Sequence, residues 1–185
     1  YINSSSSDTL LVYFFGGSTL FGFNVADFET IPSYFVQAYK EKYPNAKSIK
    51  VVNWGCPNYY SYQELILYTK LLVDGHHPDI AIFFDVLNDF YSFYFRKSYF
   101  AARPPSTSDK WFIDSLQNLF RTPAGMPEEQ FSDKLISNYF RNIESVKRMS
   151  TVTGTKSYFF CQPTPFYKYP NQMKDPMVFK DTNTR

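Results

Sequence analysis

The amino-acid sequence predicts an α/β fold, a three-layer α/β/α sandwich in which helices cover both faces of a parallel sheet. The alternation of elements supports this fold class, and the length of the chain supports a single domain. Short apolar runs that end at glycine, proline or asparagine alternate along the chain with stretches of helical periodicity. A chain of 185 residues is also long enough for one domain with a full core, and hardly long enough for two. We therefore expect one domain over residues 9–185, after a polar, serine-rich lead-in over residues 1–8.

The first predicted strand begins at Thr9 and ends at the paired glycines Gly16 and Gly17. Its unbroken apolar and aromatic run indicates a strand that is buried on both faces. Ser18 follows at the carboxyl end of this strand, and ligands bind at that edge in open parallel sheets. Ser18 is therefore either a candidate nucleophile or a turn serine that caps the next helix, and this stretch alone supports both.

The next two elements are a helix and a second strand. Thr30 as N-cap, with a proline in the first turn, predicts a helix that ends near Pro44. The β-branched run Ser48 to Asn53 predicts a strand that ends in a turn containing glycine, proline and asparagine.

A third predicted strand follows a second helix. Ser61 and Glu64 have the spacing of a capping box, which predicts the start of a helix that ends before Gly75. The apolar run over residues 78–86 is the next strand. The order βαβαβ favours a parallel sheet of the flavodoxin-like kind.

The second half of the sequence is less regular. We interpret residues 90–126, which are rich in aromatic side chains, as an insertion beside the edge of the sheet. A long helix is predicted from Pro127 to Gly154, and a fourth strand over residues 156–162. The proline-rich residues 163–185 are predicted to form a loop.

Composition excludes several classes of function. The net charge is +2 and no lysine or arginine run concentrates it, so we expect no nucleic-acid partner. No apolar run approaches the roughly 18 residues of a membrane helix, so we expect no membrane span in the chain as given. Cys56 and Cys161 lack the spacing of a metal site and are expected to be free. Compartment and oligomeric state stay open.

Polar residues follow three of the predicted strands and should meet at one edge of the sheet. They are Ser18, the turn from Asn53 to Asn58, and the pair Asn88 and Asp89. A serine surrounded by backbone N–H groups and an asparagine amide is what acyl transfer requires, namely a nucleophile and donors for the oxyanion. The alternative is that Asn88 and Asp89 merely begin a helix or turn.

These motifs resemble the blocks of the SGNH or GDSL-type hydrolases. Gly16-Gly17-Ser18-Thr19 looks like the first block, with Gly17 in place of the usual Asp. The segment Asn53 to Ser61 is similar to the second block, and Val86-Leu87-Asn88-Asp89 to the third, with Val86 in place of its leading glycine. The resemblance implies that Ser18 is the nucleophile. It also implies an oxyanion hole formed by the N–H groups of Ser18 and Asn58 and the amide of Asn88.

The family's fourth block, an Asp and a His near the carboxyl end, has no match in the sequence. The two histidines, His76 and His77, precede the third strand and should lie at the opposite edge from Ser18. Crossing between the edges means spanning a strand, roughly 17 Å. We expect that the sequence stops before the final block. The alternative is a pseudo-enzyme that retains only the binding edge.

The sequence therefore predicts a serine esterase that cleaves or transfers an acyl ester of a small molecule or glycan through an acyl-enzyme on Ser18. No metal or organic cofactor is expected. The alternative is a non-catalytic domain that binds carbohydrate or acyl chains. Nucleotide binding at Gly16 and Gly17 is disfavoured, because the turn lacks both the P-loop lysine and the third glycine of a dinucleotide fingerprint.

Overall fold

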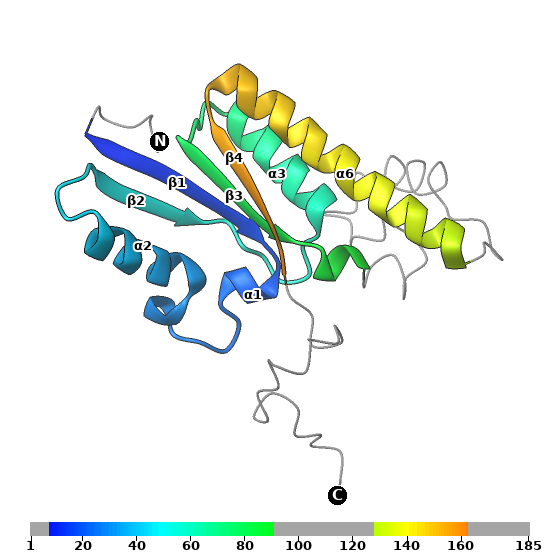
Figure 1. Cartoon of the computed structure of the whole chain (residues 1–185), viewed down its shortest axis with the longest axis horizontal. Helices are drawn as coiled ribbons and strands as arrows, with labels where there is room; N and C mark the ends of the chain where they lie inside the picture. The colour runs from blue at the N-terminus through cyan, green and yellow to red at the C-terminus, as the bar shows by residue number, and fades with distance from the viewer. Residues whose placement is uncertain (1–7, 91–127, 163–185) are drawn as a thin grey trace, which may run out of the picture.

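A computed structural model describes residues 8–90 and 128–162 of the chain. Its four parallel strands form one sheet in the order β2-β1-β3-β4 (Figure 1). The strands are β1 (Thr9–Gly16), β2 (Ser48–Asn53), β3 (Ile80–Asp85) and β4 (Lys156–Cys161). The helices are α1 (Ser18–Phe21), the short 3₁₀ turn η1 (Asp27–Glu29), α2 (Ile31–Lys42), α3 (Ser61–Val73) and α6 (Glu128–Thr153). A further helix begins over residues 87–90.

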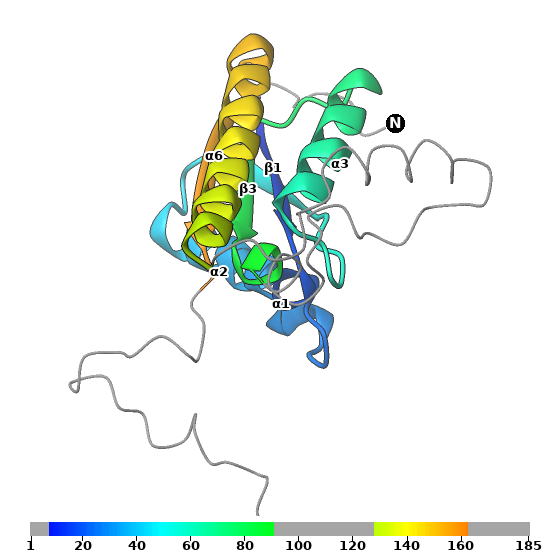
Figure 2. The same cartoon turned by 90° about the vertical axis from the view of Figure 1, so that its right-hand side faces the viewer.

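Helices cover both faces of the sheet. Helices α3 and α6 lie side by side on one face, and α2 lies on the other (Figures 1 and 2). The strand order is the beginning of the doubly wound order 2-1-3-4-5. The predicted α/β fold with a parallel sheet is therefore confirmed.

Strand β1 runs through the centre of the sheet and divides the core in two. Leu11, Tyr13 and Phe15 pack into one cluster with side chains of α3 and α6. Val12 and Phe14 alternate with them and pack into a second cluster on the α2 face. The ring of Phe15 stacks on that of Phe83 in β3, with centroids 4.7 Å apart. The expected burial of this strand on both faces is confirmed, because Leu11, Tyr13 and Phe15 on one face and Val12 and Phe14 on the other are at most 3% exposed.

Local signals set the ends of several helices where they were expected. The hydroxyl of Thr30 accepts a hydrogen bond from the Ser33 N–H at 3.4 Å and caps α2. Helices α3 and α6 end just before Gly75 and Gly154, which have φ values of 85° and 73°. This left-handed conformation is the usual C-terminal stop, because glycine adopts it without a steric cost.

The predicted capping box at the start of α3 is wrong. Tyr60 occupies the N-cap position and makes no side-chain cap, while Ser61 is the first residue of the helix. The Ser61 hydroxyl donates to the carboxylate of Asp89, which is 28 residues away. Glu64 is buried, with 1% exposure. A contact distant in sequence thus replaces the local one that the Ser-x-x-Glu pattern indicated.

Three predictions concern residues outside the described part of the chain: the lead-in over residues 1–7, most of the insertion over residues 90–126, and the loop over residues 163–185. Within the described residues, no helix combines the length and hydropathy that crossing a membrane requires. Cys56 and Cys161 are both free, as expected.

The packing of β1 leads to a first prediction. Replacing the fully buried Phe15 by alanine should lower the free energy of unfolding by about 3–5 kcal/mol, because the change removes ring contacts and leaves a cavity. Urea unfolding followed by circular dichroism measures this. The matched control is Phe28→Ala, which removes a ring that is 69% exposed and should change stability by less than about 0.5 kcal/mol. Equal effects of the two substitutions would contradict this account of the core.

Candidate active site

The carboxyl ends of the four strands lie along one edge of the sheet, because all the strands are parallel. Gly16 at the end of β1 pairs with Phe84, and Asp85 at the end of β3 pairs with Cys161. The loop after β2 continues the pairing, since the N–H of Cys56 donates to the carbonyl of Gly16 at 2.9 Å. Segments far apart in the sequence therefore meet beyond Gly16.

Ser18 is the first residue of α1, directly after the paired glycines. Its neighbour Gly17 is packed so closely that an added Cβ atom would lie 2.2 Å from Nδ2 of Asn88 and 3.2 Å from the carbonyl oxygen of Tyr59. Glycine allows this approach because it has no side chain. The turn that carries Ser18 thus lies against both of the other predicted blocks.

The side chain of Asn88 contacts the segment that contains Asn58 at the neighbouring residue Tyr59. Nδ2 of Asn88 donates a hydrogen bond of 2.6 Å to the carbonyl oxygen of Tyr59. Asn58, the preceding residue, is exposed and has a φ of 66°, a conformation that asparagine tolerates better than most residues. The structure therefore gathers the segments of Ser18, Asn58 and Asn88 at one place. The chemical role of each residue stays a prediction.

The alternative interpretation of Asn88 and Asp89 is correct as far as local structure goes. Residues 87–90 are helical, so both residues do lie at the start of a helix. Their side chains nevertheless bond to the loop after β2. Local structure and a place in the site are thus compatible.

Two further side chains join this edge that the sequence did not single out individually. Nδ2 of Asn53 donates to the carbonyl of Leu20 at 2.9 Å, which ties the end of β2 to α1. Gln162, which follows β4, donates through Nε2 to Oγ1 of Thr19 at 2.7 Å. A polar residue directly after a parallel strand is the signal that could have identified Gln162.

Val86 occupies the place of the glycine that leads the third block in the family. Its φ is 87°, which is a strained conformation for a β-branched residue. The turn after β3 therefore needs the backbone of a glycine even though the sequence supplies valine.

Cys56 lies in the loop after β2, near these groups. Burial raises the pKa of the Cys56 thiol, and a hydrogen bond with Tyr59 opposes this increase only in part. A thiol attacks only as thiolate, and a raised pKa keeps it protonated. Ser18 thus remains the candidate nucleophile at this edge.

Among residues 8–90 and 128–162, no side chain hydrogen-bonds to the Ser18 hydroxyl as a general base would. His76 and His77 precede β3, at the opposite edge of the sheet, as the sequence predicted. The described residues also contain no group of three or more His, Cys, Asp or Glu side chains placed to hold a metal ion.

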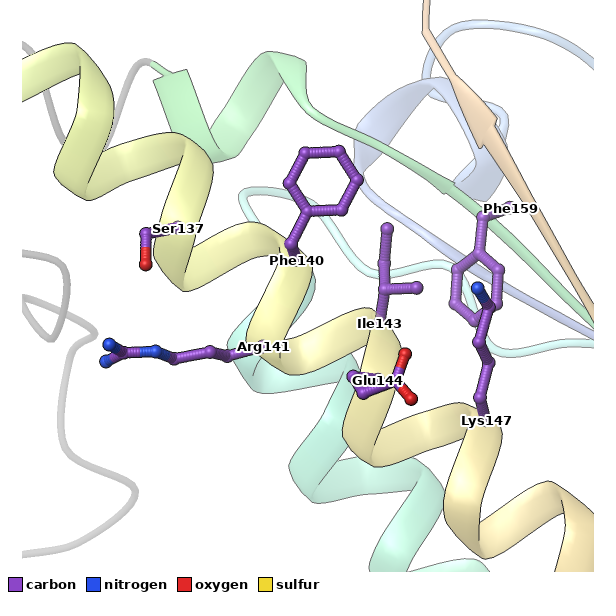
Figure 3. A pocket seen from close by; sticks show the side chains of 7 residues that line it. All are labelled: Ser137, Phe140, Arg141, Ile143, Glu144, Lys147 and Phe159. Atoms are coloured by element: carbon purple, nitrogen blue, oxygen red, sulfur yellow. The ribbon is translucent and has the colours of Figure 1, made fainter.

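A groove lies away from this edge, between α6 and the neighbouring strand β4. Figure 3 shows Phe140 and Ile143 of α6 beside Phe159 of β4, with Lys147 at one end. None of the predicted site residues lines this groove. The candidate site is therefore the edge that carries Ser18.

Comparison with known proteins adds the fold. No family model and no curated protein matches the sequence. The similar solved structures include TesA (12% identity, TM-score 0.45), BT4096, a gut microbial diltiazem-metabolizing enzyme (14%, 0.50), and a GDSL-like lipase from Parabacteroides merdae (12%, 0.45). The alignments cover 80%, 85% and 82% of this chain.

The chain shares its α/β fold with these solved structures, and its TM-score with BT4096 is 0.50. The chain spans 58%, 28% and 58% of the three proteins named above, so it corresponds to part of each. Sequence identities of 12% to 14% show a shared fold only, so the chemistry is argued from the residues of the site.

The strain at Val86 yields a second prediction. Val86→Gly should raise the free energy of unfolding by about 1 kcal/mol, because relief of roughly 1–3 kcal/mol of backbone strain exceeds the entropic cost of a glycine. Thermal and urea unfolding measure the change. Val73→Gly, in the last turn of α3 at an 81% exposed side chain, is the control and should be destabilising. Destabilisation by both substitutions would contradict a strained turn at Val86.

Proposed function

We propose that this edge hydrolyses or transfers an acyl ester through an acyl-enzyme on Ser18. The Ser18 oxygen would attack the ester carbonyl and the alcohol would leave. Water or a second alcohol would then release the acyl group. The proposal keeps the three predicted oxyanion donors: the N–H groups of Ser18 and Asn58, and the side-chain amide of Asn88.

The observation that carries the proposal is the packing of Gly17 against Asn88 and Tyr59. It puts the residue before Ser18 within contact distance of the Asn88 amide and of the residue after Asn58. An oxyanion hole requires donors from separate segments that converge beside the nucleophile, and the close contacts of Gly17 with the Asn88 amide and the Tyr59 carbonyl support such an arrangement here. A serine that only capped a helix would not require this close approach.

The hydrogen bonds of Asn88 leave one donor for a substrate. An asparagine amide has two N–H groups, and one of them is bonded to the Tyr59 carbonyl. The bond also fixes the orientation of the amide. A donor that is held in place before the reaction stabilises a developing negative charge with no free-energy cost of reorganisation.

The proton of Ser18 needs an acceptor. His76 and His77 lie at the opposite edge of the sheet, so the proposal requires a base that the described residues do not supply, and a histidine is the usual one. Tests of activity therefore use the full native protein. The substrate class remains a small-molecule or glycan ester.

A non-catalytic domain that binds carbohydrate or acyl chains is the alternative function. It would use the same edge without a base. Hydrolysis of an activated ester by the full native chain separates the two functions, because a binding domain leaves the ester at its buffer rate.

The central prediction concerns Ser18 and Asn88. In the full native chain, Ser18→Ala should abolish hydrolysis of p-nitrophenyl acetate above background. Asn88→Ala should lower kcat by about 100-fold to 1,000-fold with a smaller change in KM, because the lost donor acts mainly in the transition state. Release of p-nitrophenol measures both.

The matched control for Ser18→Ala is Ser145→Ala. Ser145 lies on α6 and is exposed, and its hydroxyl bonds only to the local Arg141 carbonyl. We expect activity within about twofold of the wild type. Unchanged turnover in Ser18→Ala would refute the acyl-enzyme. Hydrolysis at the buffer rate by the wild-type chain would instead favour the binding domain.

A fourth prediction tests the close approach at Gly17. Gly17→Ala places a methyl group where the Asn88 amide lies, 2.2 Å from Nδ2, so the amide must move off the Tyr59 carbonyl. Because this amide is the end of a side chain that can rotate, the fold should survive. We expect kcat to fall by about 10-fold to 1,000-fold, with the free energy of unfolding changing by less than about 2 kcal/mol. Full activity in a folded Gly17→Ala protein would contradict the role of this amide.

A further inference from the structure

Three carboxyl groups are buried directly behind the Asn88 turn. Glu64 of α3 and Asp89 are each 1% exposed, and Asp85, the last residue of β3, is 6% exposed. Burial, with a further contribution from neighbouring carboxylates, raises the pKa of Glu64 well above its ordinary value and that of Asp85 to about 7. Three like charges in one buried place are strongly unfavourable, so at least one proton is bound near neutral pH.

Hydrogen bonds identify Asp89 as the charged member. Its two oxygens accept from Ser61, one from the N–H at 3.1 Å and one from the hydroxyl. The Ser61 oxygen accepts in turn from Nδ2 of Asn142 at 2.9 Å, so the Ser61 proton is directed to Asp89. A carboxylate that accepts two hydrogen bonds at the first turn of a helix is stabilised as an anion.

Glu64 and Asp85 hold the proton between them. As carboxylates they offer only acceptors, and both Glu64 oxygens and Oδ1 of Asp85 are then buried without a donor. With a proton on Glu64, the acid donates a hydrogen bond to Asp85. The pair therefore satisfies its buried oxygens only in the protonated state.

The groups that surround the pair are also acidic. Asp89 faces it from the turn after β3, and Tyr139 faces it from α6, with Cys161 of β4 beside Tyr139. The Tyr139 hydroxyl is buried and has no hydrogen-bond partner among the described residues. Burial raises its pKa, and the neighbouring carboxyl groups raise it further. A second negative charge on the pair would thus meet the negative charge of Asp89.

The cluster is connected to the candidate site through consecutive residues. Asn88 binds the carbonyl of Tyr59, and Asp89 binds the N–H of Ser61, two residues further on. We call these two contacts the 88–89 clip. They fix the turn after β3 against the loop that contains Asn58, and these two segments carry two of the three proposed oxyanion donors.

We propose that the buried Glu64–Asp85 pair positions the oxyanion donors through the 88–89 clip, and that it does so only while the pair holds its shared proton. This inference rests on the proposed function for its effect on turnover. Glu64 and Asp85 are positioning residues, since neither reaches the reacting atoms. When the proton is lost, repulsion from Asp89 pushes β3 and α3 apart at the clip and displaces Asn88.

The sign of the pH effect follows from the raised pKa values. The folded protein holds protons on the pair that the unfolded chain releases at its ordinary carboxyl pKa, so the pair contributes most to stability at low pH. This contribution is lost as the pH rises through the pKa values of the pair in the folded protein. Turnover should accordingly decline on the alkaline side, whereas a histidine base causes a loss on the acid side.

The experiment compares Glu64→Gln with the wild type in the full native chain. Glutamine keeps the shape and a donor for Asp85, but it has no proton to lose. Between pH 7 and 9.5 we expect wild-type kcat for p-nitrophenyl acetate to fall at least about tenfold. The fall is smaller than the effect of removing an oxyanion donor, because the donor is displaced and not lost. KM should change less. In Glu64→Gln, kcat should fall less than about threefold over the same range.

The matched control is Glu41→Gln, the same change at an exposed position of α2, which should keep the wild-type pH profile. Circular dichroism at each pH shows whether the chain is folded. The proposal is overturned if the wild type shows no alkaline decline, if Glu64→Gln retains the decline, or if the decline coincides with global unfolding.

A second readout does not depend on catalysis. Amide hydrogen exchange in residues 57–61 and 86–90, corrected for the intrinsic effect of pH, reports whether the clip opens. We expect protection to decrease above neutral pH in the wild type and to persist in Glu64→Gln. Equal protection in both at every pH would refute the inference even if the chain is an esterase. If the wild type hydrolyses no ester while the clip still opens, the proposed function fails and the positioning device stands.

Discussion

The parallel pairing of β1 with β2 on one side and β3 on the other is the constraint on which the other features depend. The side chains of β1 pack on both faces of the sheet, Tyr13 and Phe15 towards α3 and α6, and Phe14 towards α2. No position within the strand is left for a polar group that meets substrate. Chemistry can therefore start only where the strand ends, and the parallel arrangement brings the ends of its neighbours to the same place.

This constraint explains why much of the site could be predicted from the sequence. Apolar runs that end in turn residues locate strand ends, and the parallel arrangement makes those ends neighbours. That was enough to group Ser18, the turn from Asn53 to Asn58, and Asn88, and the resemblance to the SGNH hydrolases singled out Asn58 within that turn. It could not supply the detail that Gly17 contacts the Asn88 amide, because that depends on how far one backbone approaches another.

The start of α3 shows where such reasoning fails. A serine followed three residues later by a glutamate usually forms a local cap, and the pattern cannot reveal a competing partner 28 residues away. Asp89 accepts the hydrogen bond of the Ser61 hydroxyl and also supplies the negative charge that the helix N-terminus favours. Glu64 is thereby left without a role at the cap and is turned into the core. Its place one turn before Tyr68, on the buried side of α3, was the available sign.

A strained backbone and a buried carboxyl group lie next to each other beside the candidate site. Val86 adopts a strained backbone conformation, and Asp85 holds a carboxyl group where its charge is disfavoured. A core built only for stability would place valine in extended backbone and an apolar residue at the end of β3. Both departures lie within three residues of Asn88, on the segment that fixes its amide. Strain and buried charge that gather on one short segment are expected where the precise position of a side chain matters more than stability. This is an independent reason to regard the Asn88 turn as functional.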